Sequence, residues 1–391
     1  MFEWFTSRFS IGEISGSLGD LGTLIPITLG MGKLGLVNIG TTFFWGGLFN
    51  IIGGIFWDKP IPVQPMKTIG SSALSGSLST PGSVSVAGFI TGAVVSILGY
   101  FKIIQKIADN IPSVLIGIIQ AGTGLRFSLS GVNMLKALKY WIGYDGYLLS
   151  IISALIVCFN FSNYKYSKYI PSALILFIIG LIISSVQTSI GSYKFFNPFF
   201  ITYMSSEDWK DGFIKGAIPQ IPLTILNSII GIVDLTNSLF ENNKMTIKEA
   251  SLSLGFINIL GCPFGAMPSC HGAGGLSGQY KFGARNGLSV IIIGILKIII
   301  SLLFGNILLD LISNFPSSIL GIMLLICGAD LTVQGLKRVK SNHTIFVLGL
   351  SIALVFELWI AFLAGVILYI LRFDKEEEQQ PQTNTVSIQC C

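Results

Sequence analysis

The segment from Cys262 to Arg285 reads Cys-Pro-Phe-Gly-Ala-Met-Pro-Ser-Cys-His-Gly-Ala-Gly-Gly-Leu-Ser-Gly-Gln-Tyr-Lys-Phe-Gly-Ala-Arg. It is dense in glycine, broken by proline and set between two long apolar runs. In a membrane protein, irregular backbone is tolerated at this depth only where it is buried in protein or lines a polar cavity. The segment is therefore a candidate binding site around which the rest of the fold is arranged.

The composition is that of a polytopic membrane protein. Of the 391 residues, 51% are hydrophobic and only 11% are charged, whereas soluble domains are about 25% charged. Each span needs about 20 mostly apolar residues, which leaves room for about a dozen to fourteen spans and for no sizeable soluble domain. The net charge of +5 is scattered over loop lysines and arginines. The distribution of these charges therefore indicates how the chain is oriented in a lipid bilayer, and it indicates no nucleic-acid partner.

Neither a cleaved leader nor a disulfide framework is expected. The stretch up to Gly30 carries Glu13 and Asp20 among glycines and lacks an apolar core with a cleavage site, so insertion should start with the first span. The six cysteines show no paired spacing. They are Cys158, Cys262, Cys270, Cys327, Cys390 and Cys391.

Hydrophobic runs between turn signals predict fourteen apolar segments in an all-α fold. The third and tenth are too short to cross a hydrocarbon core alone, so we predict half-helices there. The predicted segments are 12–31, 37–57, 65–78, 84–102, 111–126, 145–161, 170–187, 217–240, 248–262, 271–281, 286–306, 316–333, 343–356 and 357–372.

An internal repeat relates the two halves of the chain. Gly47-Leu-Phe-Asn-Ile-Ile-Gly53 returns as Gly255-Phe-Ile-Asn-Ile-Leu-Gly261. Asn110-Ile-Pro-Ser-Val-Leu-Ile-Gly-Ile118 returns as Asn314-Phe-Pro-Ser-Ser-Ile-Leu-Gly-Ile322. Because each half holds seven segments, an odd number, the second copy runs in the opposite direction and the repeats are inverted. Inverted repeats of secondary transporters hold substrate near the bilayer midplane, between broken helices.

The repeat and the charge distribution define the predicted domains. An even number of segments puts both termini on one side, and most of the 24 Lys and Arg residues lie on that side, which is therefore cytoplasmic. We expect the plasma membrane rather than a vacuolar or other internal membrane. The parts are a cytoplasmic N-terminus (1–11), the first repeat (12–187), an extracytoplasmic connecting loop (188–216), the second repeat (217–372) and a disordered cytoplasmic tail (373–391). Cys390 and Cys391 at the end of that tail either accept a lipid or stay exposed thiols.

The opening segment has a counterpart in the first half, Lys59-Pro-Ile-Pro-Val-Gln-Pro-Met-Lys-Thr68. Proline is tolerated in the first turn of a helix, so we predict a helix start near Pro65 and, in the second copy, near Cys270 or His271. Backbone N–H groups at 66–68 would then be free. Two half-helix N-termini that face each other make an anion site from dipoles and unpaired donors.

Lys67 adds a positive charge to this predicted site. A lysine among apolar spans costs roughly 2.5–3.5 kcal/mol on insertion scales, so it needs a partner. An anionic substrate is one candidate. A salt bridge to an intramembrane acid is the alternative, and the two can coexist. The candidate acids are Asp20, Asp234 and Asp330.

Other polar residues follow helical faces. For serine and glycine we favour helix packing, whereas acids in a membrane are expensive and indicate a cavity or a coupling cation. The residues predicted to line a cavity or to couple transport to a cation or proton are Glu13, Asp20, Asn227, Asp234, Gln279 and Asp330.

His271 admits two roles. A neutral imidazole can donate to an oxyanion and a titrating one can couple transport to protons, while a structural hydrogen bond to a neighbouring helix is equally open. Adjacent helical residues do not face one another, so Cys270 and His271 make no catalytic pair. With Cys262 they also lack the fourth ligand of a zinc site. We therefore expect no enzyme, no metal and no cofactor.

Four motifs resemble the molybdate transporters related to the sulfate permeases. They are Gly12-Glu-Ile-Ser-Gly-Ser-Leu-Gly-Asp-Leu-Gly-Thr-Leu-Ile-Pro26, Pro62-Val-Gln-Pro-Met-Lys-Thr68, Pro219-Gln-Ile-Pro-Leu-Thr-Ile-Leu-Asn-Ser228 and Pro268 to Arg285. The resemblance runs from residue 10 to about 372. It implies a seven-plus-seven inverted-repeat fold with core and gate domains and movement of a tetrahedral oxyanion. Sulfate permeases usually carry a STAS domain after the last span, and we expect none here, in agreement with the molybdate branch.

The resemblance also implies a substrate site, to which the neighbouring Thr68 is added. Its residues are Gln64, Pro65, Met66, Lys67, Thr68, Cys270, His271, Gly272, Ala273, Gly274 and Gly275. The predicted function is a secondary active transporter of molybdate, coupled to a cation or a proton. Transport of sulfate or another tetrahedral oxyanion is the alternative, whereas an intramembrane enzyme or receptor would need a catalytic pair that we do not find. The oligomeric state stays open between monomer and homodimer.

Overall fold

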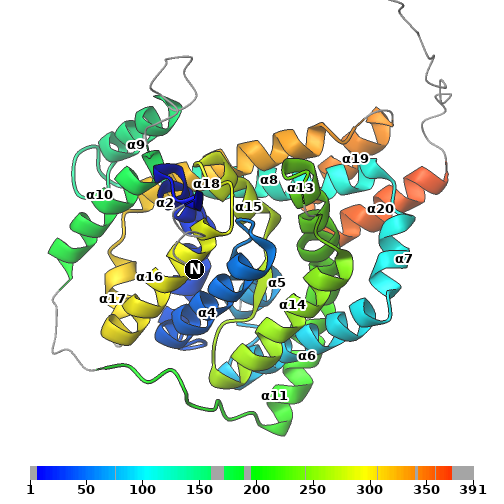
Figure 1. The fold of residues 1–391 in the computed structure, drawn as a ribbon, viewed down its shortest axis with the longest axis horizontal. Helices are drawn as coiled ribbons and strands as arrows, with labels where there is room; N and C mark the ends of the chain where they lie inside the picture. Colours follow the sequence, from blue (N-terminus) through cyan, green and yellow to red (C-terminus); the bar gives the residue numbers. More distant parts are fainter. Residues whose placement is uncertain are drawn as a thin grey trace, which may run out of the picture.

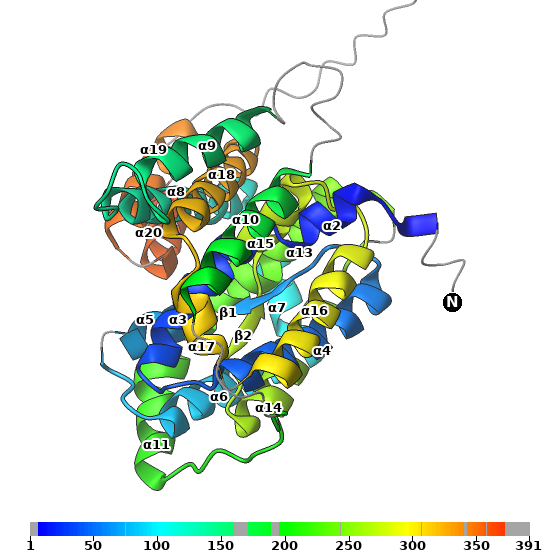
Figure 2. The same cartoon turned by 90° about the vertical axis from the view of Figure 1, so that its left-hand side faces the viewer.

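The computed structural model describes residues 7–74, 76–159, 171–188, 195–242, 244–305, 307–339, 342–356 and 358–371. Within these ranges the chain is helical except for loops and one two-stranded sheet near the centre of the molecule (Figure 2). The tail predicted at 373–391, with Cys390 and Cys391, lies outside the described residues.

The elements of the first half follow one another along the sequence. They are α2 (Ile11–Ser17), α3 (Leu21–Lys33), α4 (Ile39–Trp57), β1 (Val63–Pro65), α5 (Lys67–Leu74), α6 (Pro81–Tyr100), α7 (Ile103–Asp109), α8 (Ser113–Lys136), α9 (Tyr147–Phe159) and α10 (Ser172–Gln187).

The second half begins with one long helical stretch and then repeats the order of the first. Its elements are α11 (Ser206–Asp211), α12 (Ile218–Leu223), α13 (Gly231–Leu239), α14 (Ile247–Gly261), β2 (Ser269–His271), α15 (Ala273–Lys281), α16 (Leu288–Phe304), α17 (Leu308–Ser313), α18 (Ser317–Leu336), α19 (His343–Val355) and α20 (Leu358–Ile370). Two π-helical turns, Gly212–Ala217 and Thr224–Ile230, join α11, α12 and α13.

Every predicted apolar segment contains a helix. Within the described ranges, five helices are long and apolar enough to cross a membrane. They are Ile39–Trp57, Pro81–Tyr100, Ser113–Lys136, Ser206–Leu239 and Ser317–Leu336. Shorter apolar helices, such as Leu288–Phe304, account for further predicted segments.

The helices predicted to start near Pro65 and near Cys270 or His271 are present, and each starts two to three residues later than predicted. Those residues lie in β1 and β2, and α5 and α15 begin only at Lys67 and Ala273. The strands pair antiparallel, with Gln64 opposite Cys270. Buried backbone groups need partners where water is absent, and the two broken chains satisfy each other by pairing.

Two other boundaries also differ from the prediction. The first segment, predicted as 12–31, is interrupted by a turn between α2 and α3. The eighth segment, predicted from 217, extends back to Ser206, because α11 continues through π-helical turns into α12. The apolar pattern alone marks where a helix is buried in lipid and gives no sign of how far it continues beyond.

Asn50 and Asn258, which match in the sequence repeat, have the same structural role. The Asn50 side-chain oxygen accepts a hydrogen bond from the Val63 N–H at 2.8 Å. The Asn258 side-chain oxygen accepts one from the Ser269 N–H at 2.8 Å, and its amide donates to the Ser269 carbonyl at 2.6 Å. Each asparagine therefore fixes the strand that leads into its own half-helix.

Helix packing repeats in the same way. α4 of the first half packs on α16 of the second, and their counterparts in the repeat, α14 of the second half and α6 of the first, pack on each other. α8 packs along α18, and a Cβ on Gly124 or on Gly328 would collide with the backbone of the other helix. Small residues allow such close approach of helices in a membrane.

Two layers of helices enclose the small sheet. Figure 2 shows α8, α9, α18, α19 and α20 gathered on one side, and α4, α6, α14 and α16 on the other, with β1 and β2 between the two groups. Figure 1 gives the same separation, with α8, α18 and α19 along one edge of the molecule. The broken segments therefore meet where the two layers face each other.

Candidate functional site

The paired strands bring the starts of α5 and α15 together at the centre of the molecule. The first N–H groups of an α-helix have no partner inside the helix and point outward as donors. In α15 the N–H of Leu276 donates to the Gly272 carbonyl at 3.0 Å, which is the first hydrogen bond of the helix. The N–H groups of Ala273, Gly274 and Gly275 come before it in the chain and are the donors at this helix end. This end of α15 is suited to bind an anion.

The start of α5 is different, because a side chain caps it. The Gln220 side-chain oxygen, on α12, accepts hydrogen bonds from the N–H groups of Thr68 (2.9 Å) and Ile69 (3.2 Å). The N–H of Met66 donates to the Pro268 carbonyl at 2.8 Å. The prediction of free N–H groups at 66–68 is therefore wrong for Met66 and Thr68, since buried donors take whatever acceptor is in reach.

Lys67 brings a cation to this place. Its Nζ is buried and has no hydrogen-bond partner among the described residues, and it lies 4.0 Å from the centroid of the Phe127 ring. In the described part of the chain no carboxylate forms an ion pair with it. Asp234 pairs with Arg338 at 2.7 Å and Asp330 with Lys281 at 3.3 Å. A buried charge without an anionic partner is expensive, which makes Lys67 a candidate ligand for an anion.

Gln64 reaches from β1 to α15. A Cβ on Gly272 or on Gly275 would overlap the Gln64 side chain, so a side chain at either position would have to displace Gln64. The Gln64 amide donates to the Asp20 carboxylate and to Thr23 Oγ1, the latter at 2.5 Å. The structure therefore brings Gln64, Asp20 and the glycines of α15 together in one buried cluster.

His271 is held by hydrogen bonds within the protein. Its Nε2 lies 3.0 Å from Ser253 Oγ on α14, and its Nδ1 lies 3.4 Å from the Pro62 carbonyl oxygen. The ring also meets Trp57 edge to face at 5.2 Å. Because both ring nitrogens have partners, the geometry favours the structural role for this histidine.

The remaining residues of the predicted substrate site are buried around the sheet. Met66 is 1% exposed and belongs to the hydrophobic core. Cys270 Sγ lies 3.8 Å from the carbonyl oxygen of Pro65. Ala273 is fully buried at the start of α15. These side chains support the backbone of the site and offer it no charge.

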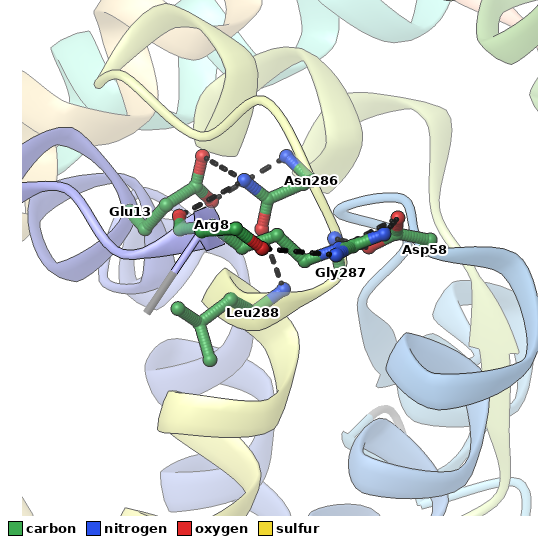
Figure 3. A network of polar contacts seen from close by, with 7 residues as sticks. Arg8, Glu13, Asp58, Asn286, Gly287 and Leu288 are labelled. Atoms are coloured by element: carbon green, nitrogen blue, oxygen red, sulfur yellow. Dashed lines mark hydrogen bonds and ion pairs between the residues drawn. The ribbon is translucent and has the colours of Figure 1, made fainter. Parts of the chain in front are cut away.

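Several predicted cavity or coupling residues lie in structural contacts away from the sheet. Glu13 accepts hydrogen bonds from the Arg285 N–H (2.8 Å) and the Asn286 side chain (3.1 Å), and so holds the loop before α16 (Figure 3). Asp234 accepts from Gln120 at 3.2 Å as well as from Arg338.

Of the other predicted cavity or coupling residues, Asp330 and Gln279 lie on or beside α15, and Asn227 lies in the π-helical turn Thr224–Ile230. Asp330 accepts from Ser277 Oγ on α15 at 2.6 Å. Gln279 accepts from Ser289 Oγ at 3.3 Å. The buried Asn227 side-chain oxygen has no hydrogen-bond partner in the described residues.

A small polar cavity opens beside Lys67. Its volume is about 150 Å³, room for about five waters. It lies between α5 and α8 and is lined by Lys67, Thr68, Ser71, Thr123, Arg126, Phe127, Leu223 and Leu358. A larger cavity of about 470 Å³, between Gly32 and Phe200, has no charged side chain in its lining and does not suit a dianion.

Three residues of this region were not predicted as site residues. Gln220 appears in the sequence analysis only within the motif from Pro219 to Ser228. Arg126 marked the end of the fifth predicted segment, yet α8 continues to Lys136 and Arg126 lies well inside it. Phe127 carries no signal in the sequence that separates it from the other phenylalanines.

Sequence comparison relates the chain to transporters. A family model described as "Molybdate transporter of MFS superfamily" matches residues 12–127 and 212–331. Molybdate transporter 2 of Arabidopsis thaliana is 36% identical, with 92% of this chain and 86% of that protein covered. Molybdate transporter 1 of the same plant is 33% identical, with coverage of 93% and 88%.

Solved structures show the fold. The transmembrane domain of the cyanobacterial bicarbonate transporter BicA matches with a TM-score of 0.55 at 14% identity, over 91% of this chain and 96% of that one. The murine anion transporter Slc26a9 in its inward-facing state matches with a TM-score of 0.62 at 13% identity, over 95% and 70%. The chain is therefore an all-helical integral membrane protein with an SLC26-like transmembrane fold.

Proposed function

The chain belongs to the molybdate transporter family, and from that premise we propose that it carries molybdate as a secondary transporter, with the dianion bound between Lys67 and the start of α15. Family membership confirms the expectation of a transporter rather than an enzyme. The observation that carries the proposed site is the buried Lys67 Nζ, which has no hydrogen-bond partner among the described residues and lines a polar cavity.

The two halves of the site would contribute different things. Lys67 supplies a full positive charge. The start of α15 supplies backbone donors and a helix dipole equivalent to roughly half a charge. Gln220 caps the start of α5 with a neutral oxygen, so it satisfies the backbone there without adding an anion that would compete with substrate.

Asp20 is the proposed point of coupling to a cation or proton. It is 5% exposed and accepts a hydrogen bond from Gln64, whose side chain lies against Gly272 and Gly275. A change in the charge of the Asp20 carboxylate would therefore affect the start of α15 through the Gln64 side chain. Asn227, with its buried unpaired oxygen in the described residues, would line the same core.

The proposed architecture is a seven-plus-seven inverted repeat of fourteen segments. The repeated element order, the matched roles of Asn50 and Asn258, and the two helical layers support it. We assign the layer of α4, α6, α14 and α16 to the core domain and the layer of α8, α18, α19 and α20 to the gate. The excess of Lys and Arg on one side supports cytoplasmic termini, and the membrane we propose is the plasma membrane.

Uptake by cells that express the chain tests this function. We expect labelled molybdate to accumulate above an empty-vector control, with most uptake retained in the presence of equimolar sulfate. Lys67→Ala should reduce uptake about tenfold or more, because a charge-assisted hydrogen bond contributes about 1.5–3 kcal/mol. Lys33→Ala, at the exposed end of α3, is the matched control and should transport normally.

The outcomes separate the candidate functions. If equimolar sulfate abolishes molybdate uptake, sulfate becomes the better candidate substrate. If cells accumulate neither anion, transport of a tetrahedral oxyanion is contradicted. If Lys67→Ala reaches the cell surface and transports at the wild-type rate, Lys67 is not a substrate ligand.

A further inference from the structure

An aromatic ring from α8 occupies the place where the anion would bind. The Phe127 ring centroid lies 4.0 Å from Lys67 Nζ. The same ring packs directly on Gly274, where an added Cβ would collide with three of its carbon atoms. Phe127 is 8% exposed, so the ring is enclosed at this position. One side chain of the opposite layer therefore covers both the cation and the donor end of α15.

We propose that Phe127 is a built-in competitor of the substrate, which covers the empty site and is displaced when the anion binds. This inference rests on the proposed function, because it takes Lys67 and the start of α15 as the anion ligands. It adds a residue of α8 that sets affinity and links occupancy of the site to the position of that helix.

The contact explains how Lys67 is tolerated without a carboxylate partner. The face of an aromatic ring carries partial negative charge and attracts a cation placed over it. The ring therefore acts as a substitute for the anion. It is a weaker one, because an oxyanion forms charge-assisted hydrogen bonds with the ammonium group and with backbone N–H groups.

Displacement of the ring involves the whole helix. Arg126, the residue before Phe127, donates from its Nε to the Ala353 carbonyl at 2.9 Å and from a second nitrogen to the Phe356 carbonyl. These bonds tie α8 to the end of α19. The cavity beside Lys67 is lined by residues of both α5 and α8, and Phe127 is one of them. An anion that takes the place of the ring would therefore separate α8 from α5 and α15.

Binding of labelled molybdate to the purified full chain tests the competition. A ligand that must displace a competing state binds with reduced apparent affinity, so removal of the competitor should tighten binding. Phe127→Leu keeps the apolar bulk and removes the aromatic face, and we expect its Kd to fall about fivefold. Phe127→Trp strengthens the cation contact, and we expect its Kd to rise.

The controls separate competition from packing. Phe177→Leu changes another phenylalanine that packs on Phe315, away from Lys67, and should leave the Kd unchanged. A merely structural Phe127 predicts weaker or unchanged binding in both variants, and either result overturns the proposal. Wild-type protein that binds no molybdate would contradict the proposed function itself, which is a distinct outcome.

A second variant covers the case in which leucine disturbs folding. Trifluorophenylalanine at position 127 keeps the shape of the ring and withdraws electrons from its face, which weakens cation binding. We expect molybdate to bind this protein more tightly than the wild type. Unchanged binding would exclude the cation contact as the competitor.

Discussion

Asn50 and Asn258 occupy equivalent places in the two halves of the chain, and each accepts a 2.8 Å hydrogen bond from the first residue of the strand that follows it. The sequence repeat places the two residues in matching motifs. Their common role shows that the repeat preserves the means by which a broken segment is held, and not only its hydrophobicity.

Substitution of these asparagines should destabilise the protein unequally. Asn258→Ala removes four hydrogen bonds, two to Ser269 and one each to Leu254 and Cys262, whereas Asn50→Ala removes the bond from the Val63 N–H. A buried donor or acceptor left unsatisfied costs about 1–3 kcal/mol. Thermal unfolding in detergent should therefore show a larger fall in Tm for Asn258→Ala. Asn133→Ala, at an exposed position of α8, is the control, and equal Tm values for all three would contradict the prediction.

Gly272→Ala should impair the site by collision. The added Cβ would overlap the Gln64 side chain, and forced overpacking costs typically about 1–3 kcal/mol. We expect molybdate uptake to fall about tenfold while the protein still reaches the membrane. Gly46→Ala is the matched control, because the added Cβ meets no atom within 4 Å.

A double substitution identifies the cause of that loss. If the clash with Gln64 is responsible, Gln64→Ala added to Gly272→Ala should recover the Tm lost by the single variant. A double variant less stable than either single variant would instead show that the backbone at 272 cannot accept a side chain.

Gln220→Glu should separate stability from binding. The carboxylate has nearly the same shape as the amide and can accept the hydrogen bonds of Thr68 and Ile69. It loses the bond that the amide donates to Thr224 Oγ1 at 2.9 Å and buries an acid, so the Tm should fall, and thermal unfolding measures this loss apart from binding. The new negative charge at the start of α5 would repel a dianion, and the KM for molybdate should rise about tenfold or more. Initial uptake rates at varied molybdate give this KM. An unchanged KM would remove the start of α5 from the anion path.

The polar cluster around Asp58 should contribute to stability chiefly through Asp58 itself. Its carboxylate accepts from Arg8 at 2.7–2.9 Å and from the Gly287 N–H at 3.3 Å (Figure 3). Asp58→Ala leaves that N–H unpaired and places alanine at a φ of 50°, so a loss of about 1–3 kcal/mol is expected.

Arg8→Ala should cost less. The Arg8 and Asp58 side chains are about a third exposed, at 30% and 34%, and exposed ion pairs contribute about 0–1 kcal/mol. Thermal unfolding at low and high salt should show the effect of Arg8→Ala shrinking as salt screens the pair. A larger loss for Arg8→Ala than for Asp58→Ala would contradict this order.

Helix positions were predictable because lipid imposes a simple rule. An apolar run must form its backbone hydrogen bonds internally, so its limits follow from composition. The segment predicted at 145–161 is a helix over Tyr147–Phe159, and the one predicted at 170–187 is a helix over Ser172–Gln187. The two half-helices were also recognised, because proline and glycine interrupt the apolar pattern there.

The pairing of β1 with β2 was not predictable in the same way. Three-residue strands are too short for an alternating pattern, and their partners lie in opposite halves of the chain. The partner of Lys67 could not be identified from the sequence for a similar reason. Its candidates were chosen because they carry negative charge, whereas the observed contact with Phe127 depends on how the helices pack. Phe127 is one of 28 phenylalanines, and only the fold places it over the cation.

The close glycine contact between α8 and α18 sets the size of the unit that can move. With Gly124 and Gly328 pressed against each other's backbone, the two helices have almost no side-chain layer between them to deform. A displacement of α8 at Phe127 would therefore carry α18 with it. If an anion displaces Phe127 as proposed, α8 and α18 would move as one pair.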